Sequence, residues 1–131
     1  MKFDVGILRL ASEAANHATA RQSVIAENMA NSDTPGYRAK DIVSFADTIH
    51  TKPNISAHFR PVRAGHIPFE TYANGYRADE QSAFATETPN GNNVSVEDQM
   101  VRAAEVKHQH ELALGVYQKS MNILRASLGR K

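Results

Sequence analysis

The chain has 131 residues, enough for one ordinary domain, and its 15 basic and 14 acidic residues leave a net charge of +1. This balance argues against nucleic acid as the main partner, because proteins that bind it carry a basic excess. The absence of cysteine excludes disulfides, thiolate catalysis and cysteine-bound zinc. No stretch approaches the roughly 20 apolar residues of a membrane span, so membrane insertion is not expected.

Residues 5–30 have the alternating three- and four-residue spacing of an amphipathic helix. The opposite face carries charged side chains such as Arg9, Glu13 and Glu27. Several residues of the apolar stripe are small, which would let a partner helix approach closely. The stripe consists of Leu8, Ala11, Ala15, Ala18, Gln22, Ile25 and Met29.

The helical pattern stops at a cluster of turn-forming residues, Asn31-Ser32-Asp33-Thr34-Pro35-Gly36. Pro35 and Gly36 at the second and third positions are the type II turn combination, because glycine tolerates the positive φ needed there. Asn31 and Asp33 can close local turns and satisfy the last carbonyls of the helix. Tyr37 then places an amphipathic ring just past the corner. The segment is either an ordinary loop or a fixed joint that re-aims the chain toward a neighbour.

The middle of the chain is predicted to be largely irregular. A short amphipathic helix is expected within 41–50, and no sustained period follows from 51 to 93. The stretch around Asn74-Gly75 could form a small β-hairpin that turns at this pair. The residues TETPNGNN, 86–93, are typical of a loop.

Residues 95–129 predict a second, longer helix. Ser95 is a good N-cap and Gly129 a natural stop. About 34 residues would give a rod on the order of 50 Å, which has the proportions of a coiled coil. Its apolar stripe consists of Val96, Met100, Ala103, Lys107, His110, Leu114, Tyr117, Met121, Leu124 and Leu128.

We therefore expect a mainly α fold, in which long amphipathic N- and C-terminal helices pair as an α-helical hairpin or coiled coil around an irregular middle. The expected division is an N-terminal helix in 1–31, a turn, short helix and irregular segment in 32–94, and a C-terminal helix in 95–131. A two-helix unit leaves much of its apolar stripes exposed, so other copies or other chains are expected to complete them.

No set of residues predicts catalysis or metal binding. His108 and His110 point about 200° apart on a helix and cannot share a metal ion. Asp41 and Asp47 are six residues apart, so they do not share a helix face, and both are expected to be solvated. No serine-nucleophile, phosphate-loop or zinc motif occurs. We predict no enzyme, no catalytic residue, no cofactor and no metal site.

The stretch NMANSDTPGY, 28–37, resembles the signature N-x-A-N-x-x-T-P-G-Y of the flagellar axial proteins, the family of rod, hook and hook-associated proteins. The matching positions are Asn28, Asn31, Thr34, Pro35, Gly36 and Tyr37. The continuation RAKDI, with Phe45, is similar to the small proximal rod proteins, with Lys and Arg exchanged and one residue inserted before Phe45. The stretch GNNVSVEDQM, 91–100, also resembles the family, with Ser95 where an acidic residue is common. The resemblance covers about 1–50 and 90–131.

This resemblance implies a structural subunit of the bacterial flagellar basal body, which builds the proximal rod in the periplasm by helical self- and co-assembly. It implies export through the flagellar type III apparatus, in agreement with an N-terminus that lacks a cleavable-signal pattern. The implied partners are other rod subunits, the FliE adaptor and the export gate at the rod base.

The resemblance also implies roles for particular residues. The turn motif would set a bend, and Ile42 and Phe45 would dock on a neighbour. The packing between helices would be carried by Leu8, Ala11, Ala15, Ile25, Met29, Val96, Met100, Leu114, Tyr117, Met121, Leu124 and Leu128.

Three alternatives stay open at this point. The chain could be the sister small rod protein, or a soluble helical adaptor or export chaperone that stays in the cytoplasm. The last hypothesis leaves the turn signature unexplained. A small hydrolase or metal enzyme using His58, His66 and His110 has the least support.

Overall fold

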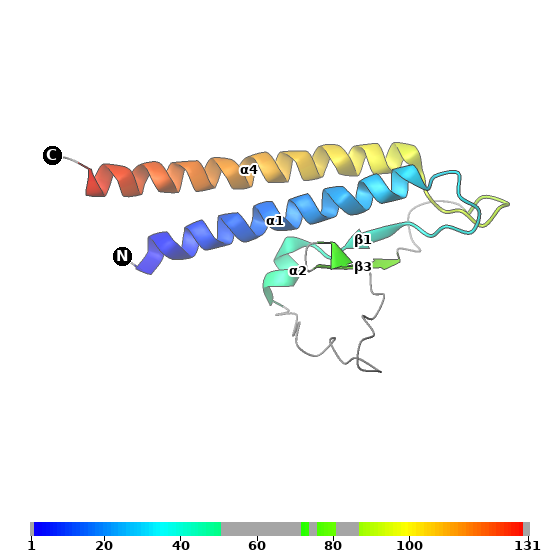
Figure 1. Ribbon diagram of the computed structural model, residues 1–131, viewed down its shortest axis with the longest axis horizontal. Coiled ribbons are helices and arrows are strands. Elements are labelled where there is room, and N and C mark those ends of the chain that lie inside the picture. Colours follow the sequence, from blue (N-terminus) through cyan, green and yellow to red (C-terminus); the bar gives the residue numbers. More distant parts are fainter. Residues whose placement is uncertain (1, 51–71, 74–75, 81–86, 130–131) are drawn as a thin grey trace, which may run out of the picture.

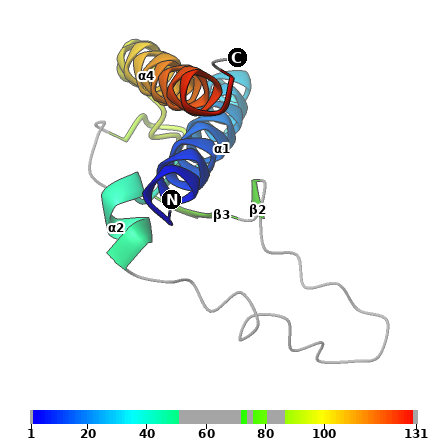
Figure 2. The ribbon, with the colours of Figure 1, turned by 90° about the vertical axis from the view of Figure 1, so that its left-hand side faces the viewer.

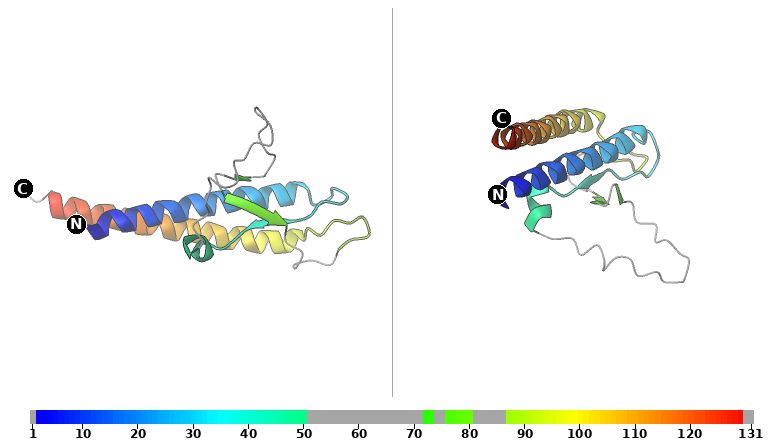
Figure 3. Two further views of the ribbon diagram at one scale, coloured as in Figure 1. Left: turned by 90° about the horizontal axis from the view of Figure 1, so that it is seen from below. Right: turned by 60° about the vertical axis from the view of Figure 1, so that its left-hand side comes forward.

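Two long antiparallel helices form the frame of the protein. The structure is a computed structural model that describes residues 2–50, 72–73, 76–80 and 87–129. Helix α1 spans Lys2–Ala30 and helix α4 spans Val96–Leu128. They lie side by side, with the start of α1 and the end of α4 at the same end of the molecule (Figures 1 and 3). The predicted helical hairpin is therefore confirmed.

A small sheet packs against α1 beside the side that α4 covers, and a short helix lies next to it (Figure 2). The sheet is antiparallel with the order β1-β3-β2. Ala73 pairs with Tyr76, so the predicted hairpin around Asn74-Gly75 is confirmed in its strands, while the turn itself lies outside the described residues. The elements are β1 Lys40–Ile42, α2 Phe45–His50, β2 Tyr72–Ala73 and β3 Tyr76–Glu80.

Helix α1 is buried on two sides, and each side has its own core cluster. Toward α4, Ala18 and Ile25 pack with Val106. Toward the sheet, Ala20 and Val24 pack with Ile42. The predicted stripe of α1 contains Ala18 and Ile25 but not Ala20 and Val24. The prediction considered only one packing partner for this helix.

The ends of α4 follow local capping chemistry. Ser95 has an extended backbone, and its Oγ accepts a hydrogen bond from the Asp98 backbone N–H at 3.3 Å. At the other end, the Gly129 N–H donates to the Arg125 carbonyl at 2.8 Å. Both contacts satisfy groups that a helix terminus otherwise leaves unpaired, and the predicted N-cap and stop are confirmed.

The face that α4 turns toward α1 differs from the predicted stripe. The buried residues of α4 are Gln99, Val106 and Ala113, each one position before a residue of that stripe. Met100 is 56% exposed and Leu114 is 42% exposed. One residue corresponds to a rotation of about 100° around the helix axis. The predicted buried face of α4 was wrong because several faces of this helix carry apolar residues. Helix α1 packs on the face that offers small side chains and Gln99.

Among the described helices, none combines the length and the apolar character needed to cross a membrane.

Candidate functional site: the joint between the helices

The end of α1 is closed by the residues that follow it. The Asn31 backbone N–H and side-chain Nδ2 both donate to the Glu27 carbonyl, at 3.1 and 2.9 Å. The Thr34 N–H then donates to the Asn31 carbonyl at 3.1 Å. Asn31 thus satisfies a terminal carbonyl of the helix, whereas Asp33 is exposed.

A tight turn follows at Thr34-Pro35-Gly36-Tyr37. The Tyr37 N–H donates to the Thr34 carbonyl at 3.2 Å, and Gly36 has a φ of +71°. Both features agree with the predicted type II turn. A Cβ atom on Gly36 would meet nothing within 4 Å, so the position requires glycine for its backbone conformation and not for space.

A second loop, residues 88–93, holds this turn in place. The Asn92 side-chain Nδ2 donates to the carbonyls of Asn31 and Thr34, at 2.9 and 2.8 Å. The Gly36 N–H donates to the Asn90 carbonyl at 3.0 Å. We call the two loops, 31–37 and 88–93, the clasp. The sequence predicted the second loop only as a loop and missed Asn92, although its place beside Asn93 before a capped helix was an available signal.

Substituting Asn92 by alanine is expected to loosen the clasp while keeping both helices. The residue is 2% exposed, and its loss removes one hydrogen bond from each of two carbonyls, which keep their backbone donors, at a cost of about 0.5–1.5 kcal/mol per bond. Hydrogen exchange should show faster exchange of the Gly36 and Tyr37 amides with unchanged protection in the middle of α4. Equal exchange at these two amides in both proteins would contradict the contact. Asp33→Ala, at an exposed position of the first loop, is the matched control.

Asn28 connects three elements under the clasp. It is fully buried, and its Nδ2 donates to the Lys40 carbonyl at 2.7 Å and to Gln99 Oε1 at 3.0 Å. Its Oδ1 accepts from the Lys40 N–H at 3.0 Å. The side chain therefore pairs with the β1 backbone as a strand would, and also contacts α4.

Tyr37 covers this contact from outside. Its hydroxyl lies 3.3 Å from Asn28 Oδ1 and 3.4 Å from Glu27 Oε1. Burial, together with the nearby Glu27 carboxylate, raises the pKa of Tyr37 to about 12. The hydroxyl therefore keeps its proton at neutral pH and can donate to either oxygen.

An ion cluster lies below the joint, formed by Arg21, Asp41 and Arg102, which are largely buried, and by Asp98, which is partly exposed. Asp41 receives two hydrogen bonds from Arg21, both at 2.8 Å, and one from Arg102 at 2.6 Å. Arg102 also binds Asp98 at 2.8 Å. Burial alone would raise the pKa of Asp41, but the Arg21 hydrogen bonds and the two positive charges hold it below its usual value. We call these four residues the Asp41 cluster.

The expectation that Asp41 is solvated was wrong. Its side chain is 7% exposed, because β1 carries it between the two helices, where both arginines reach it. Asp47 is exposed, and its N–H donates to Ser44 Oγ at the start of α2. The two carboxylates therefore do not form a pair. Because both oxygens of the Asp41 carboxylate are bonded to arginines, this carboxylate is not a free acid or base for chemistry.

His17 occupies a buried position beside α2 and the sheet. Its Nε2 donates to the Val43 carbonyl at 2.8 Å, and its ring contacts Phe45 and Tyr76. Burial lowers the pKa of His17 below 6.5, with a smaller contribution from the charge of Arg21. In the unfolded chain this histidine takes up a proton near pH 6.5, while in the folded chain it is protonated only at a lower pH.

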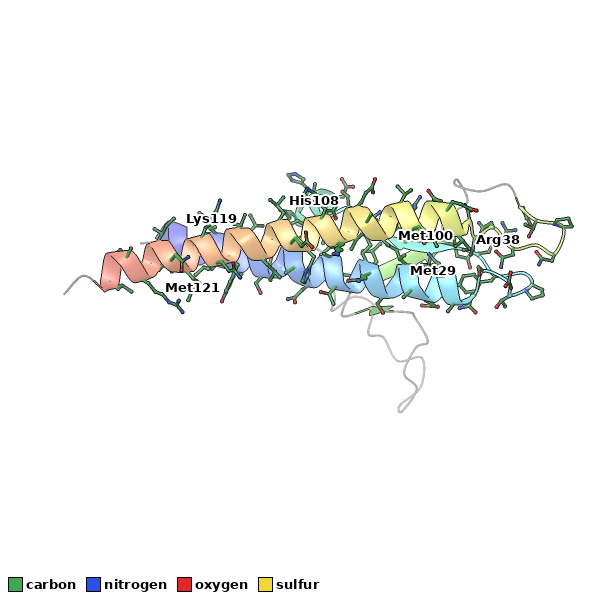
Figure 4. All side chains as sticks on the ribbon, turned by 90° about the horizontal axis from the view of Figure 1, so that it is seen from above. Met29, Arg38, Met100, His108, Lys119 and Met121 are labelled. Carbon is green, nitrogen blue, oxygen red and sulfur yellow. The ribbon has the colours of Figure 1, made fainter. Side chains whose placement is uncertain are left out.

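The free energy of unfolding is therefore expected to fall as the pH drops below about 6.5 toward the lowered pKa of His17. His17→Gln keeps a side-chain N–H donor but does not titrate, so it should reduce this pH dependence. Urea unfolding at pH 7.5 and 5.5 measures it. His108→Gln, at an exposed position on α4 (Figure 4), is the matched control. An unchanged pH dependence in His17→Gln would show that burial of this ring has no such effect.

The residues predicted to carry helix packing or, as Ile42 and Phe45, to dock on a neighbour fall into three groups in the structure. Ala11, Ile25 and Ile42 are buried, and Ile42 packs on Ala20 and Val24, so its side chain has no surface left for a neighbour. Those that are half-buried are Leu8, Ala15, Met29, Phe45, Val96, Met121 and Leu124. Met29 lies on α1 near the joint (Figure 4). The exposed ones are Met100, Leu114, Tyr117 and Leu128, and a role of these residues in contacts with other chains stays a prediction.

An apolar groove runs between the first half of α1, helix α2 and the middle of α4. Its volume is about 430 Å³. Large apolar side chains that remain substantially exposed are found along it, which is unusual for a chain that acts alone. The groove is lined chiefly by Ile7, Leu10, Ala14, Phe45, Ala46, Leu112 and Val116.

Within the part of the chain that the structure describes, no three His, Asp or Glu side chains come together as metal ligands. The same residues contain no buried side-chain nitrogen or oxygen without a hydrogen-bond partner. The buried polar side chains of the joint therefore all have hydrogen-bond partners, and this geometry is suited to holding the chain in one shape.

Comparison with known proteins gives a consistent result. The model of the flagella basal body rod protein family matches residues 8–38. The chain is 31% identical to the flagellar basal body rod protein FlgB of Escherichia coli K12, over 91% of this chain and 93% of that protein. It is 27% identical to the protein of the same name from Bacillus subtilis 168, over 98% and 97% of the two chains. The family match spans most of α1 and includes the first loop of the clasp.

Proposed function

Because this chain belongs to the FlgB family of flagellar basal body rod proteins, we propose that its clasp is a fixed joint required for building the proximal rod. The chain is a structural subunit of the basal body rod. In the proposal, the paired helices of 1–31 and 95–131 form the axial part of the subunit. The segment 32–94 leaves this pair at an angle that the clasp sets.

The observation that carries the proposal is the hydrogen bonding of Asn92 across the clasp. Its amide bonds two carbonyls of the other loop, 58 and 61 residues away. Gly36, with its positive φ, forms the turn in which the Tyr37 N–H bonds the Thr34 carbonyl. A loop that only connected two elements would not need a buried side chain from a distant loop to fix it.

The exposed apolar side chains support assembly with other chains. The apolar groove and the exposed residues of α4, such as Met100 and Leu114, offer surface that a neighbouring subunit can cover. We propose other rod subunits as the main partners, by self- and co-assembly, with the FliE adaptor and the export gate at the rod base. Heterologous contacts of this kind build an open helical array.

The proposed route to the rod is export through the flagellar type III apparatus to the periplasm, without a cleaved signal peptide. The role is purely structural, without catalysis. It differs from that of a cytoplasmic adaptor or export chaperone. It also differs from that of the sister small rod protein FlgC, because the relatives that match along most of this chain are named FlgB.

Fractionation of flagellated cells tests the proposal. A strain that lacks the native gene is complemented with a tagged copy, and its basal bodies are purified. The tagged chain should be found in the basal bodies, and its omission should stop rod formation. A tagged chain that restores motility but stays entirely in the cytosol would refute the rod role and favour the adaptor.

A further inference from the structure

The apolar contact between α1 and α4 combines several alanines with a few larger side chains. The core cluster that joins them contains Ala18, Ile25 and Val106, with Ala103 and Met29 beside it. Farther along, Ala11 and Ala113 are also buried. Where apolar residues recur at heptad spacing, a paired helix can take another register and still place apolar side chains in the holes of its partner. A shift of α4 by seven residues would bring Ala113 to the place of Val106.

Two polar contacts do not tolerate such a shift. Asn28 of α1 binds Gln99 of α4 at 3.0 Å, and both side chains are buried. Arg21 and Arg102 meet at Asp41 of β1, with side chains 16%, 12% and 7% exposed. Sliding α4 by a turn would separate Arg102 from Asp41 and Gln99 from Asn28. It would leave polar groups buried without partners, which is the costly case.

We propose that the Asp41 cluster and the Asn28–Gln99 pair specify the register in which α1 and α4 pair, rather than supplying the stability of the pair. A buried charge group is a poor source of stability, because its desolvation offsets much of the attraction between its charges. A buried polar residue at a helix interface is well suited to fixing one register, because every other register leaves it unsatisfied.

The position of Asp41 gives this mechanism a link to the joint. Asp41 is four residues past Tyr37 and on the strand that Asn28 pairs with. Its carboxylate also accepts from the Ile42 N–H at 2.8 Å. The joint therefore places the group that both helices must reach, and the register of the helices follows from the position of β1.

The test replaces the polar contacts by apolar side chains of similar size, in the variant Arg21→Met, Asp41→Leu, Gln99→Leu and Arg102→Met. Asn28 keeps its bonds to Lys40 in this variant. Because the chain has no cysteine, spin labels can be placed only at Ser23→Cys and Gln118→Cys, two exposed positions on α1 and α4. Double electron–electron resonance then reports the register as a distance distribution.

The unsubstituted chain should give one narrow distance. The apolar variant should keep its helicity and melt at the same or a higher temperature, but give a broad or double distribution, with peaks about 10 Å apart for a shift of one heptad. The matched control, Arg9→Met with Glu13→Leu, removes an exposed ion pair and should keep the narrow distance. A single narrow distance in the apolar variant would overturn the proposal. Its failure to fold would also overturn it, because the contacts would then supply stability.

Discussion

Cells that carry Gly36→Val in place of the natural residue should be non-motile and lack a completed rod, while synthesis and export of the chain continue. Gly36 has a φ of +71°, in the left-handed region, which costs a non-glycine residue about 1–2 kcal/mol and a β-branched residue at the upper end of this range. That cost is small beside a typical folding free energy of about 5–15 kcal/mol. The chain should therefore fold, but its turn should adopt another conformation and change the direction in which the following segment leaves.

Two further substitutions separate the turn conformation from other effects. Gly36→Asn should largely preserve motility, because asparagine tolerates the left-handed region far better than valine. Gly115→Ala, in the middle of α4, should leave the fold of the chain unchanged, because a Cβ there meets nothing within 4 Å and alanine favours the helix. Motility on soft agar and electron microscopy of basal bodies measure the outcome. Normal swimming of the Gly36→Val strain would rule out the fixed joint.

Replacing Asp41 by alanine should destabilise the chain more than any other single change considered. The carboxylate neutralises Arg21 and Arg102, whose side chains are 16% and 12% exposed. Removing the carboxylate takes away the negative charge that both arginines share. Breaking one side of a buried ion pair in this way costs about 3–5 kcal/mol. Urea unfolding followed by circular dichroism should therefore show a much lower midpoint at pH 7.

The exposed pair of Arg9 and Glu13 provides the comparison for Asp41. Their side chains are 81% and 51% exposed, so Glu13→Ala should change the free energy of unfolding by no more than about 1 kcal/mol. If Asp41→Ala and Glu13→Ala had equal effects, the Asp41 cluster would not be a buried ion pair in solution. The lowered pKa of Asp41 gives an independent test. The contribution of this carboxylate to the free energy of unfolding should be fully present above pH 3.8 and be lost as the pH falls toward the lowered value.

The features that sequence reasoning predicted correctly depend on neighbouring residues. The helix ends at Ser95 and Gly129 follow from capping preferences within one turn. The turn at Pro35-Gly36 follows from the φ values that these two residues favour. Two strands around Asn74-Gly75 follow from the hairpin preference of that pair. In each case the physical cause lies within about four residues of its effect.

The features that were missed depend on residues far apart in the chain. Asp41 meets Arg21 across 20 residues and Arg102 across 61, and the sign of a charge does not reveal which distant charge it pairs with. The second face of α1, with Ala20 and Val24, is buried only because β1 packs there. The buried line of α4 could not be chosen from its sequence, because Met100 and Leu114 are more hydrophobic than Gln99 and yet lie outside.

The most direct test of the fixed joint is the structure of this chain within the assembled rod, determined by electron cryomicroscopy of purified basal bodies. If the joint is fixed, α1, α4 and the clasp keep their present arrangement there. Asn92 Nδ2 should lie within hydrogen-bond distance of the Asn31 and Thr34 carbonyls, as it does at 2.9 and 2.8 Å here. A rod in which residues 31–37 have straightened, or have separated from residues 88–93, would contradict it.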